Sequence, residues 1–247
     1  MIYALLLAAG LWAGMQNALA GGGSFITLPA LILAGMTPLA ANITSTVALF
    51  PGQVTSGVSG RSLVSGAGRL SFKALFAISV AGGVVGGLLL LNTPSSIFAR
   101  LVPWLVLFAT LVFAWGSFLR KPKPDGEAHI GPGTAGVLQF LIAIYGGYFG
   151  GGIGFLMLAA LTMAGLPTRA AGATKNVLAG VMNAAAVMLF VGSPQVHWAE
   201  ACALGVGAIG GGLLGAWALR RVNERALRIA VVCIGVALTV GLFVKSV

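Results

Sequence analysis

Residues 17–35 read NALAGGGSFITLPALILAG, and three consecutive glycines, Gly21 to Gly23, interrupt an otherwise apolar run. Glycine inside a helix costs about 1 kcal/mol relative to alanine, so three in a row predict a break between two helices. A hydrophobic run of this kind lies where lipid offers no hydrogen bonds to exposed N–H and C=O groups. Such a break is tolerated only where it is buried in protein or lines a water-filled cavity.

The chain as a whole is strongly apolar, since 58% of its 247 residues are hydrophobic and only 7% are charged. A soluble domain carries about 25% charged residues, and this chain lacks the polar surface that such a domain needs. Long unbroken apolar runs favour membrane-spanning helices over a transmembrane barrel. The net charge of +10 comes mostly from clusters between these runs, which indicates a role in topology rather than nucleic-acid binding. We therefore expect an all-α polytopic membrane protein.

The glycine break occurs a second time. Residues 145–167 read YGGYFGGGIGFLMLAALTMAGLP, and the triplet Gly150 to Gly152 lies 129 residues after the first. With one inserted residue the match continues, so that the AA-x-x-T of residues 40–44 aligns with that of residues 170–174. We predict helices near 2–20, 24–36, 39–60, 71–91 and 97–119, and again near 134–149, 153–165, 168–191, 197–218 and 226–244. The chain thus divides into a repeat of residues 1–119, a linker of residues 120–133 and a repeat of residues 134–247, each repeat with four long helices and one short one.

The distribution of Lys and Arg predicts that the two repeats are inverted relative to each other. In the first half, residues 61–73 carry three cationic side chains between the third and fourth helices. In the second half, the cationic connection is the next one, where residues 220–228 carry four arginines. Only an inverted arrangement places both connections on the cytoplasmic side, where Lys and Arg concentrate. We therefore expect a cytoplasmic linker and both termini on the outer side of a bacterial inner membrane.

The helix starts that follow the two breaks are candidate anion sites. In secondary transporters with inverted repeats, paired broken helices form the substrate site near the bilayer midplane. The free N–H groups at the start of each half-helix attract anions. In this chain these starts fall at Gly22, Gly23 and Ser24, and at Gly151 and Gly152. Close helix packing is the alternative interpretation, and it suits other glycine runs such as GGVVGG at 82–87 better.

Polar residues of the next helix in each half complete the predicted site. Residues seven apart share a helix face, so Thr46 and Gln53 in one half, and Asn176 and Asn183 in the other, form two matching stripes. Lys175 adds a cation within an apolar helix, although it could instead extend to the lipid headgroups. The predicted substrate-binding residues are therefore Gly22, Gly23, Ser24, Thr44, Ser45, Thr46, Gln53, Gly151, Gly152, Thr174, Lys175, Asn176 and Asn183.

The glycine breaks, the short helices that follow them and the two AA-x-x-T helix starts resemble the sulfite exporter TauE/SafE family over nearly the whole chain. The matching positions are Gly21 to Ser24 with Pro29, Gly150 to Gly152, Thr44 to Thr46 and Thr174 to Asn176. The resemblance implies transport of small sulfur-containing or organic anions such as sulfite, sulfonates or sulfoacetate. Members often show Gly-Thr-Ser at the helix start, whereas this chain has Asn-Ile-Thr-Ser and Gly-Ala-Thr-Lys. Because Lys175 departs from the motif, the resemblance does not identify the exact substrate.

We therefore expect a secondary transporter, an exporter that works by alternating access around a midplane anion site. A channel-like anion pore and a non-transport assembly or scaffold protein are the alternatives. An enzyme is not expected, because His129 and His197 have no nucleophile or metal-ligand partner in the sequence. The expected partners are a small anion and the lipid bilayer, without nucleic acid, metal or cofactor. The sequence leaves open the coupling ion and whether the chain forms a homo-oligomer.

Overall fold

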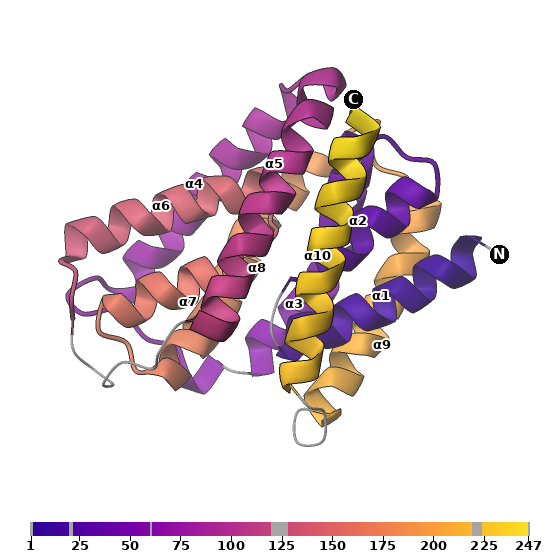
Figure 1. Cartoon of the computed structure of the whole chain (residues 1–247). Coiled ribbons are helices and arrows are strands. Elements are labelled where there is room, and N and C mark those ends of the chain that lie inside the picture. The colour runs from indigo at the N-terminus through magenta and orange to yellow at the C-terminus, as the bar shows by residue number, and fades with distance from the viewer. Residues whose placement is uncertain (1, 20–21, 60, 120–127, 219–223, 247) are drawn as a thin grey trace.

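The computed structural model describes residues 2–19, 22–59, 61–119, 128–218 and 224–246. Within these ranges the regular structure is helical, apart from two isolated β-bridges. This confirms the all-α prediction (Figure 1). The helices are α1 (Ile2–Leu19), α2 (Ser24–Leu33), α3 (Pro38–Ser59), α4 (Phe72–Leu91), α5 (Ser95–Ala114), α6 (Pro132–Tyr148), α7 (Ile153–Met163), α8 (Thr168–Phe190), α9 (Trp198–Ala218) and α10 (Glu224–Ser246), with a 3-10 turn η1 (Arg61–Leu63) and a π-helical turn η2 (Trp115–Leu119).

Three of these helices, α4, α5 and α8, are long and apolar enough to cross a membrane by length and composition. By contrast, α2 and α7 contain 10 and 11 residues. At 1.5 Å per residue each covers only about 15–17 Å, roughly half of a hydrocarbon core. The last residue of α2, Leu33, is exposed, whereas the described glycines of the two breaks are buried or half-buried.

Both short helices end in the same way. Gly35 and Gly165 have φ of +94°, a conformation that glycine adopts without strain. The next N–H group, of Met36 or Leu166, then donates to the carbonyl oxygen five residues earlier, which closes the helix as a Schellman motif. This is why α2 and α7 stop at Leu33 and Met163, two to three residues before the predicted ends.

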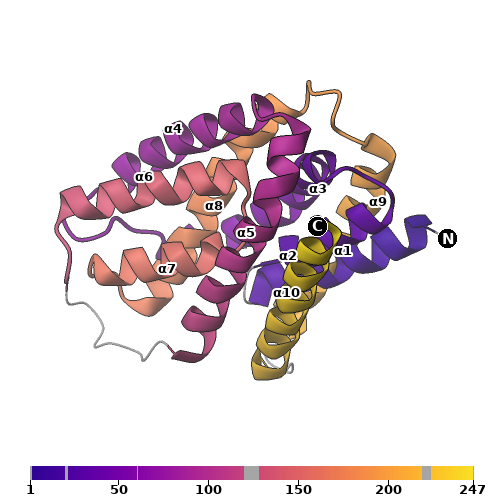
Figure 2. The same cartoon turned by 45° about the horizontal axis from the view of Figure 1, so that its top comes forward.

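The packing of the helices follows the predicted duplication. The helix α1 lies along α9, and its counterpart α6 lies along α4. In the same way α3 contacts α9 while α8 contacts α4, and the matched pairs α3 with α8 and α5 with α10 contact each other. Exchange of α1–α5 with α6–α10 therefore maps these contacts onto themselves. In Figure 2 the two groups, α4 with α6 and α1 with α9, lie at opposite ends of the molecule.

The orientation of the halves relative to a bilayer stays a prediction. The linker residues 120–127 lie outside the described residues, as do Gly21, Arg220 and Arg221. The helix α6 begins at Pro132, so the last part of the predicted linker belongs to a helix.

Glycines allow the close crossing of α1 with α9 and of α4 with α6. A methyl group added at Gly14 or Gly211 would overlap the backbone of the facing helix, at Ala208 and Leu11 respectively. The same holds for Gly86 of α4, whose added methyl would overlap the carbonyl oxygen of Ile144. The packing interpretation of the GGVVGG run is therefore confirmed.

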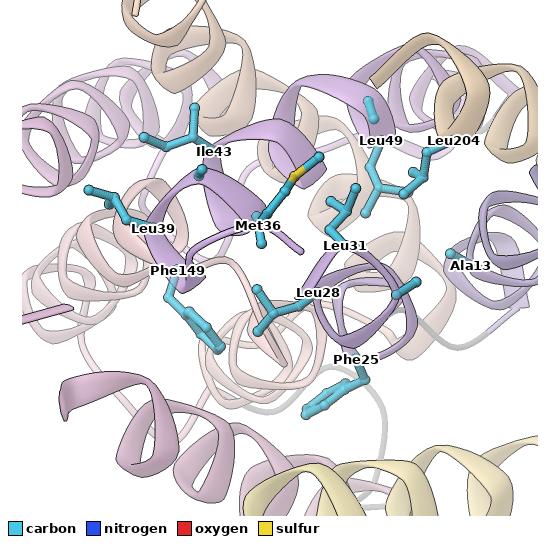
Figure 3. Close-up of a cluster of buried hydrophobic side chains, with 14 of the residues drawn as sticks. Ala13, Phe25, Leu28, Leu31, Met36, Leu39, Ile43, Leu49, Phe149 and Leu204 are labelled. Carbon is cyan, nitrogen blue, oxygen red and sulfur yellow. The ribbon is translucent and has the colours of Figure 1, made fainter. Parts of the chain in front are cut away.

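A buried apolar cluster holds α2 against α3, next to the first break (Figure 3). Phe25, Leu28 and Leu31 of α2 are at most 3% exposed and belong to one cluster with Leu39 and Ile43 of α3. Aromatic contacts then link the two short helices. Phe113 of α5 meets Phe25 edge-on at 6.0 Å and Phe155 of α7 at 4.6 Å between ring centroids. These contacts fix the starts of α2 and α7 relative to each other.

We expect Gly211→Ala to destabilise the protein by about 1–3 kcal/mol, because the added methyl group must displace backbone of α1. The matched control is Gly210→Ala on the same helix, where an added methyl group meets nothing within 4 Å. That variant should be neutral or slightly stabilising. Thermal unfolding of the purified protein, followed by tryptophan fluorescence, measures both. Equal losses in the two variants would contradict the proposed helix crossing.

Candidate functional site

The two breaks meet at one polar pocket with a cavity volume of about 60 Å³. A buried water needs roughly 15 Å³ on this measure, so the pocket has room for about four waters or one small oxyanion. Gly22 and Ser24 come from the first break, and Gly150 and Ile153 come from the second. The remaining lining residues are Asn17, Gln53, Gly154, Lys175, Asn176 and Ala179.

Backbone donors from both short helices line this pocket. The N–H groups of Ser24, Ile153 and Gly154 donate to no acceptor among the described residues, and all three residues line the pocket. The next N–H group of α7, on Phe155, already donates to the carbonyl oxygen of Gly152 at 3.2 Å. Ser24, Ile153 and Gly154 are the first residues of the two short helices, where the helix dipole also favours negative charge.

The ammonium group of Lys175 lies beside the start of α7. A methyl group added at Gly154 would lie 3.4 Å from Nζ of Lys175. Within the described ranges, this ammonium forms no ion pair and no hydrogen bond. The lining residues include no Asp or Glu. The pocket therefore contains a cation and unpaired N–H groups but no protein counter-charge, which is the composition of an anion site.

Asn17 is a lining residue that the sequence interpretation missed. Its Oδ1 accepts a hydrogen bond of 2.7 Å from the N–H of Gly23 and so caps the start of α2 across the break. This bond fixes the carboxamide and leaves its Nδ2 donors without an acceptor among the residues described. Two consecutive amide side chains, Gln16 and Asn17, stand shortly before Gly21 in a largely apolar helix, and this is the signal that could have identified Asn17.

Gln53 and Asn183, the predicted matching residues of the two halves, form a direct hydrogen bond. Nδ2 of Asn183 donates to Oε1 of Gln53 at 2.6 Å. Gln53 lines the pocket, and Asn183 lies behind it, 4% exposed. Because its oxygen is occupied, Gln53 has only its Nε2 donors to offer a ligand.

Thr44 and Thr174 lie away from the pocket and hold loops of the opposite half. The Thr44 hydroxyl donates to the carbonyl oxygen of Gln195 at 3.4 Å and accepts from the N–H of His197 at 3.2 Å. The Thr174 hydroxyl donates to the carbonyl oxygen of Ser65 at 3.3 Å and accepts from its N–H at 3.2 Å. Ser65 and Gln195 are 130 residues apart, so the bonds to their carbonyl oxygens correspond between the halves, whereas the N–H donors, Ser65 and His197, do not.

The other predicted residues lie close to the pocket or in the protein interior. Ser45 hydrogen-bonds to Thr27 at 2.6 Å, and Thr46 donates to the carbonyl oxygen of Asn42 in its own helix at 2.9 Å. Gly151 and Gly152 are buried beside Ala109 of α5. The structure thus gathers part of the predicted set around one pocket, namely Gly22, Ser24, Gln53, Lys175 and Asn176. Their role in binding stays a prediction.

Comparison with known proteins gives a consistent result. A family model described as sulfite exporter TauE/SafE matches residues 6–242. The chain is 29% identical over 247 residues to the probable membrane transporter protein ORF9 of a Sinorhizobium species, which covers 98% of this chain and 92% of that protein. It is 29% identical over 247 residues to a probable membrane transporter protein of Haemophilus influenzae (96% and 93%). It is 26% identical over 254 residues to the probable membrane transporter protein YfcA of Escherichia coli K12 (100% and 91%).

Without a bound anion, Lys175→Met should raise the stability of the protein by about 1–2 kcal/mol. The substitution removes a half-buried charge that lacks a counter-charge and keeps an apolar side chain of similar size. Lys73→Met, at an exposed position at the start of α4, is the control and should change stability little. Chemical or thermal unfolding in anion-poor buffer measures the difference. A clear loss of stability in Lys175→Met would show that the ammonium has a structural partner.

Proposed function

The chain belongs to the sulfite exporter TauE/SafE family, and from this premise we propose that it is a secondary transporter that exports small sulfur-containing or organic anions. Sulfite, sulfonates and sulfoacetate are the proposed substrates. The family and the names of the relatives support a multi-pass membrane transporter rather than an enzyme. The observation that carries the proposal is the pocket between the two helix breaks, in which the ammonium of Lys175 faces unpaired N–H groups and no carboxylate.

The pocket suits an oxyanion because it combines one cation with several N–H donors and no carboxylate. The Lys175 ammonium, the Ser24 and Gly154 N–H groups and the Gln53 amide provide hydrogen bonds to several oxygens of one ion. Hydrogen bonds to a charged partner contribute about 1.5–3 kcal/mol each, whereas a ligand without acceptors would leave these donors unpaired. Sulfite and sulfonate groups carry three oxygens around one sulfur atom, so they match converging donors better than a single-atom anion does.

Export of an anion needs no coupling ion. In a cell with an inside-negative potential, one negative charge that moves outward gains about 2.3 kcal/mol per 100 mV. That energy supports roughly a fortyfold concentration ratio. The chain has only four acidic residues, Asp125, Glu127, Glu200 and Glu224, and of these the structure describes the side chain of Glu200, which does not line the pocket. Proton-coupled carriers often use a carboxylate at the binding site. The lining residues of this pocket include no carboxylate.

A second cavity supports a carrier rather than an open pore. It has a volume of about 510 Å³ and lies between the start of α3 and the loops after α4 and α8. Tyr148 contacts the surroundings of both cavities: its hydroxyl donates to Thr93, which lines the second cavity, at 3.3 Å, and its carbonyl oxygen, two residues before Gly150 of the anion pocket, accepts from Asn42 at 3.0 Å. With the predicted orientation this cavity faces outward. We propose that transport alternates between the two cavities, with the Asn42–Tyr148 contact broken when the site opens to the outside.

Transport assays with purified protein in liposomes test the proposal. We expect saturable flux of radiolabelled sulfite or sulfoacetate, and counterflow when unlabelled anion is loaded on the opposite side. Lys175→Met should raise KM about tenfold to hundredfold, because one charged hydrogen bond is lost. Lys175→Arg should retain part of the affinity, and Lys73→Met serves as the unaffected control.

Three results would contradict the proposed transporter or the role of Lys175 in it. Flux without saturation or counterflow would favour the channel-like pore. Absence of flux for all tested anions would favour the assembly or scaffold alternative. Unchanged KM in Lys175→Met would remove the anion-binding role of the lysine.

A further inference from the structure

An apolar groove adjoins the anion pocket between the middle parts of α3 and α8. Its cavity volume is about 340 Å³, and its walls are mainly Phe50 and Val54 of α3 and Val177, Val181 and Ala184 of α8. Val54 is 43% exposed, so the groove opens to the outer surface of the helix pair. An apolar groove of this kind can bury part of a hydrocarbon chain and so reduce its exposure to water.

Two side chains belong to both spaces. Gln53 and Asn176 line the polar pocket on one side and the apolar groove on the other. They are the only polar side chains among the lining residues of the groove. A ligand that extended past this pair would therefore leave a site made of hydrogen-bond donors and enter one made of hydrocarbon.

Gly180 leaves space in the wall of the groove. A methyl group added there would meet nothing within 4 Å. One turn along the partner helix, Gly57 brings α3 close to the backbone of α8, since an added methyl would lie 3.7 Å from Asn176 and Val177. The two helices are thus close at Gly57 and apart at Gly180, which gives the groove one closed end beside the polar pocket.

On the basis of the proposed function, we propose that the substrate is an amphiphilic anion. Its anionic head binds beside Lys175, and its hydrocarbon tail passes between Gln53 and Asn176 into the groove. The polar pocket, at about 60 Å³, has room for the head alone. An apolar substituent inside the polar pocket would exclude water from the unpaired donors there without pairing with them. In the groove the same substituent would contact mainly apolar side chains. A fully inorganic anion would use the pocket and gain nothing from the groove.

A series of linear alkanesulfonates, from methanesulfonate to octanesulfonate, tests this with the full chain in lipid nanodiscs. The assay is competition against radiolabelled sulfite, with free ligand corrected for partition into empty nanodiscs. We expect affinity to rise about twofold to fourfold per methylene until the groove is filled. Alkanols of the same length should not compete, because they lack the anionic head.

Gly180→Leu, which fills the groove, should abolish the dependence on chain length and leave methanesulfonate binding near the wild-type value. Gly172→Leu is the matched control on the same helix, since its added methyl also meets nothing within 4 Å and it lines neither space. This variant should retain the wild-type series.

The outcomes separate the two proposals. A flat alkanesulfonate series in the wild-type chain, with sulfite binding intact, overturns the amphiphile and leaves the anion transporter in place. Competition by octanol equal to that by octanesulfonate also overturns it, because the groove would then hold a chain independently of the head. Loss of chain-length dependence in Gly172→Leu as well as Gly180→Leu contradicts the assignment to the groove. Failure of every anion to bind overturns the proposed function itself.

Discussion

Backbone groups that leave a helix inside an apolar layer must find other partners, and the described part of each break satisfies several of its own within the protein. At the first break, Asn17 accepts from the N–H of Gly23, and the carbonyl oxygens of Gly22 and Gly23 accept from the next turn. At the second, the carbonyl of Tyr148 accepts from the side chain of Asn42. Several N–H groups at the pocket are left without an acceptor among the described residues, and the proposed anion would pair with them. The position of the site thus follows from where the backbone is interrupted.

The framework is nearly symmetric between the halves, but the site is not. Thr44 and Thr174 donate to corresponding carbonyl oxygens of the opposite half, and Gln53 and Asn183 bond directly across the centre. In contrast, the matched positions Ser45 and Lys175 differ in chemistry and surroundings. Ser45 is buried and bonded to Thr27 of α2, whereas Lys175 faces open space at the start of α7. The position equivalent to Lys175 is therefore filled by protein contacts, which explains why the described structure forms one donor-lined pocket around the breaks instead of two.

The sequence predicted the features that depend on local chemistry. Glycine triplets predicted the breaks, and apolar periods with matched offsets predicted the ten helices to within a few residues. It was less informative where a contact joins distant segments. The helix-start motif of α3 predicted Thr44, Ser45 and Thr46 as site residues, but their hydroxyls bond to a loop, to α2 and to their own helix. Rotation of a helix about its axis and the path of a loop decide such contacts, and neither follows from spacing. Asn17 was missed for a similar reason, because its partner lies across the break.

The charge of the pocket gives a physical reason why the proposed site would act as a carrier rather than as a channel. Lys175 contributes one positive charge, and the two half-helix starts add about half a charge each. Closing an empty pocket would remove this charge from water at a desolvation cost of several kcal/mol. A bound anion would offset most of that cost. Occlusion is therefore favoured when the site is loaded. For net export the empty site must still return, and it does so with its positive charge, which an inside-negative potential draws inward. If the site acts as proposed, the membrane potential would drive the return of the empty carrier, whose net charge is that of Lys175 because helix dipoles add no net charge. A bound monoanion cancels this net charge, so the loaded site would reorient with little dependence on voltage.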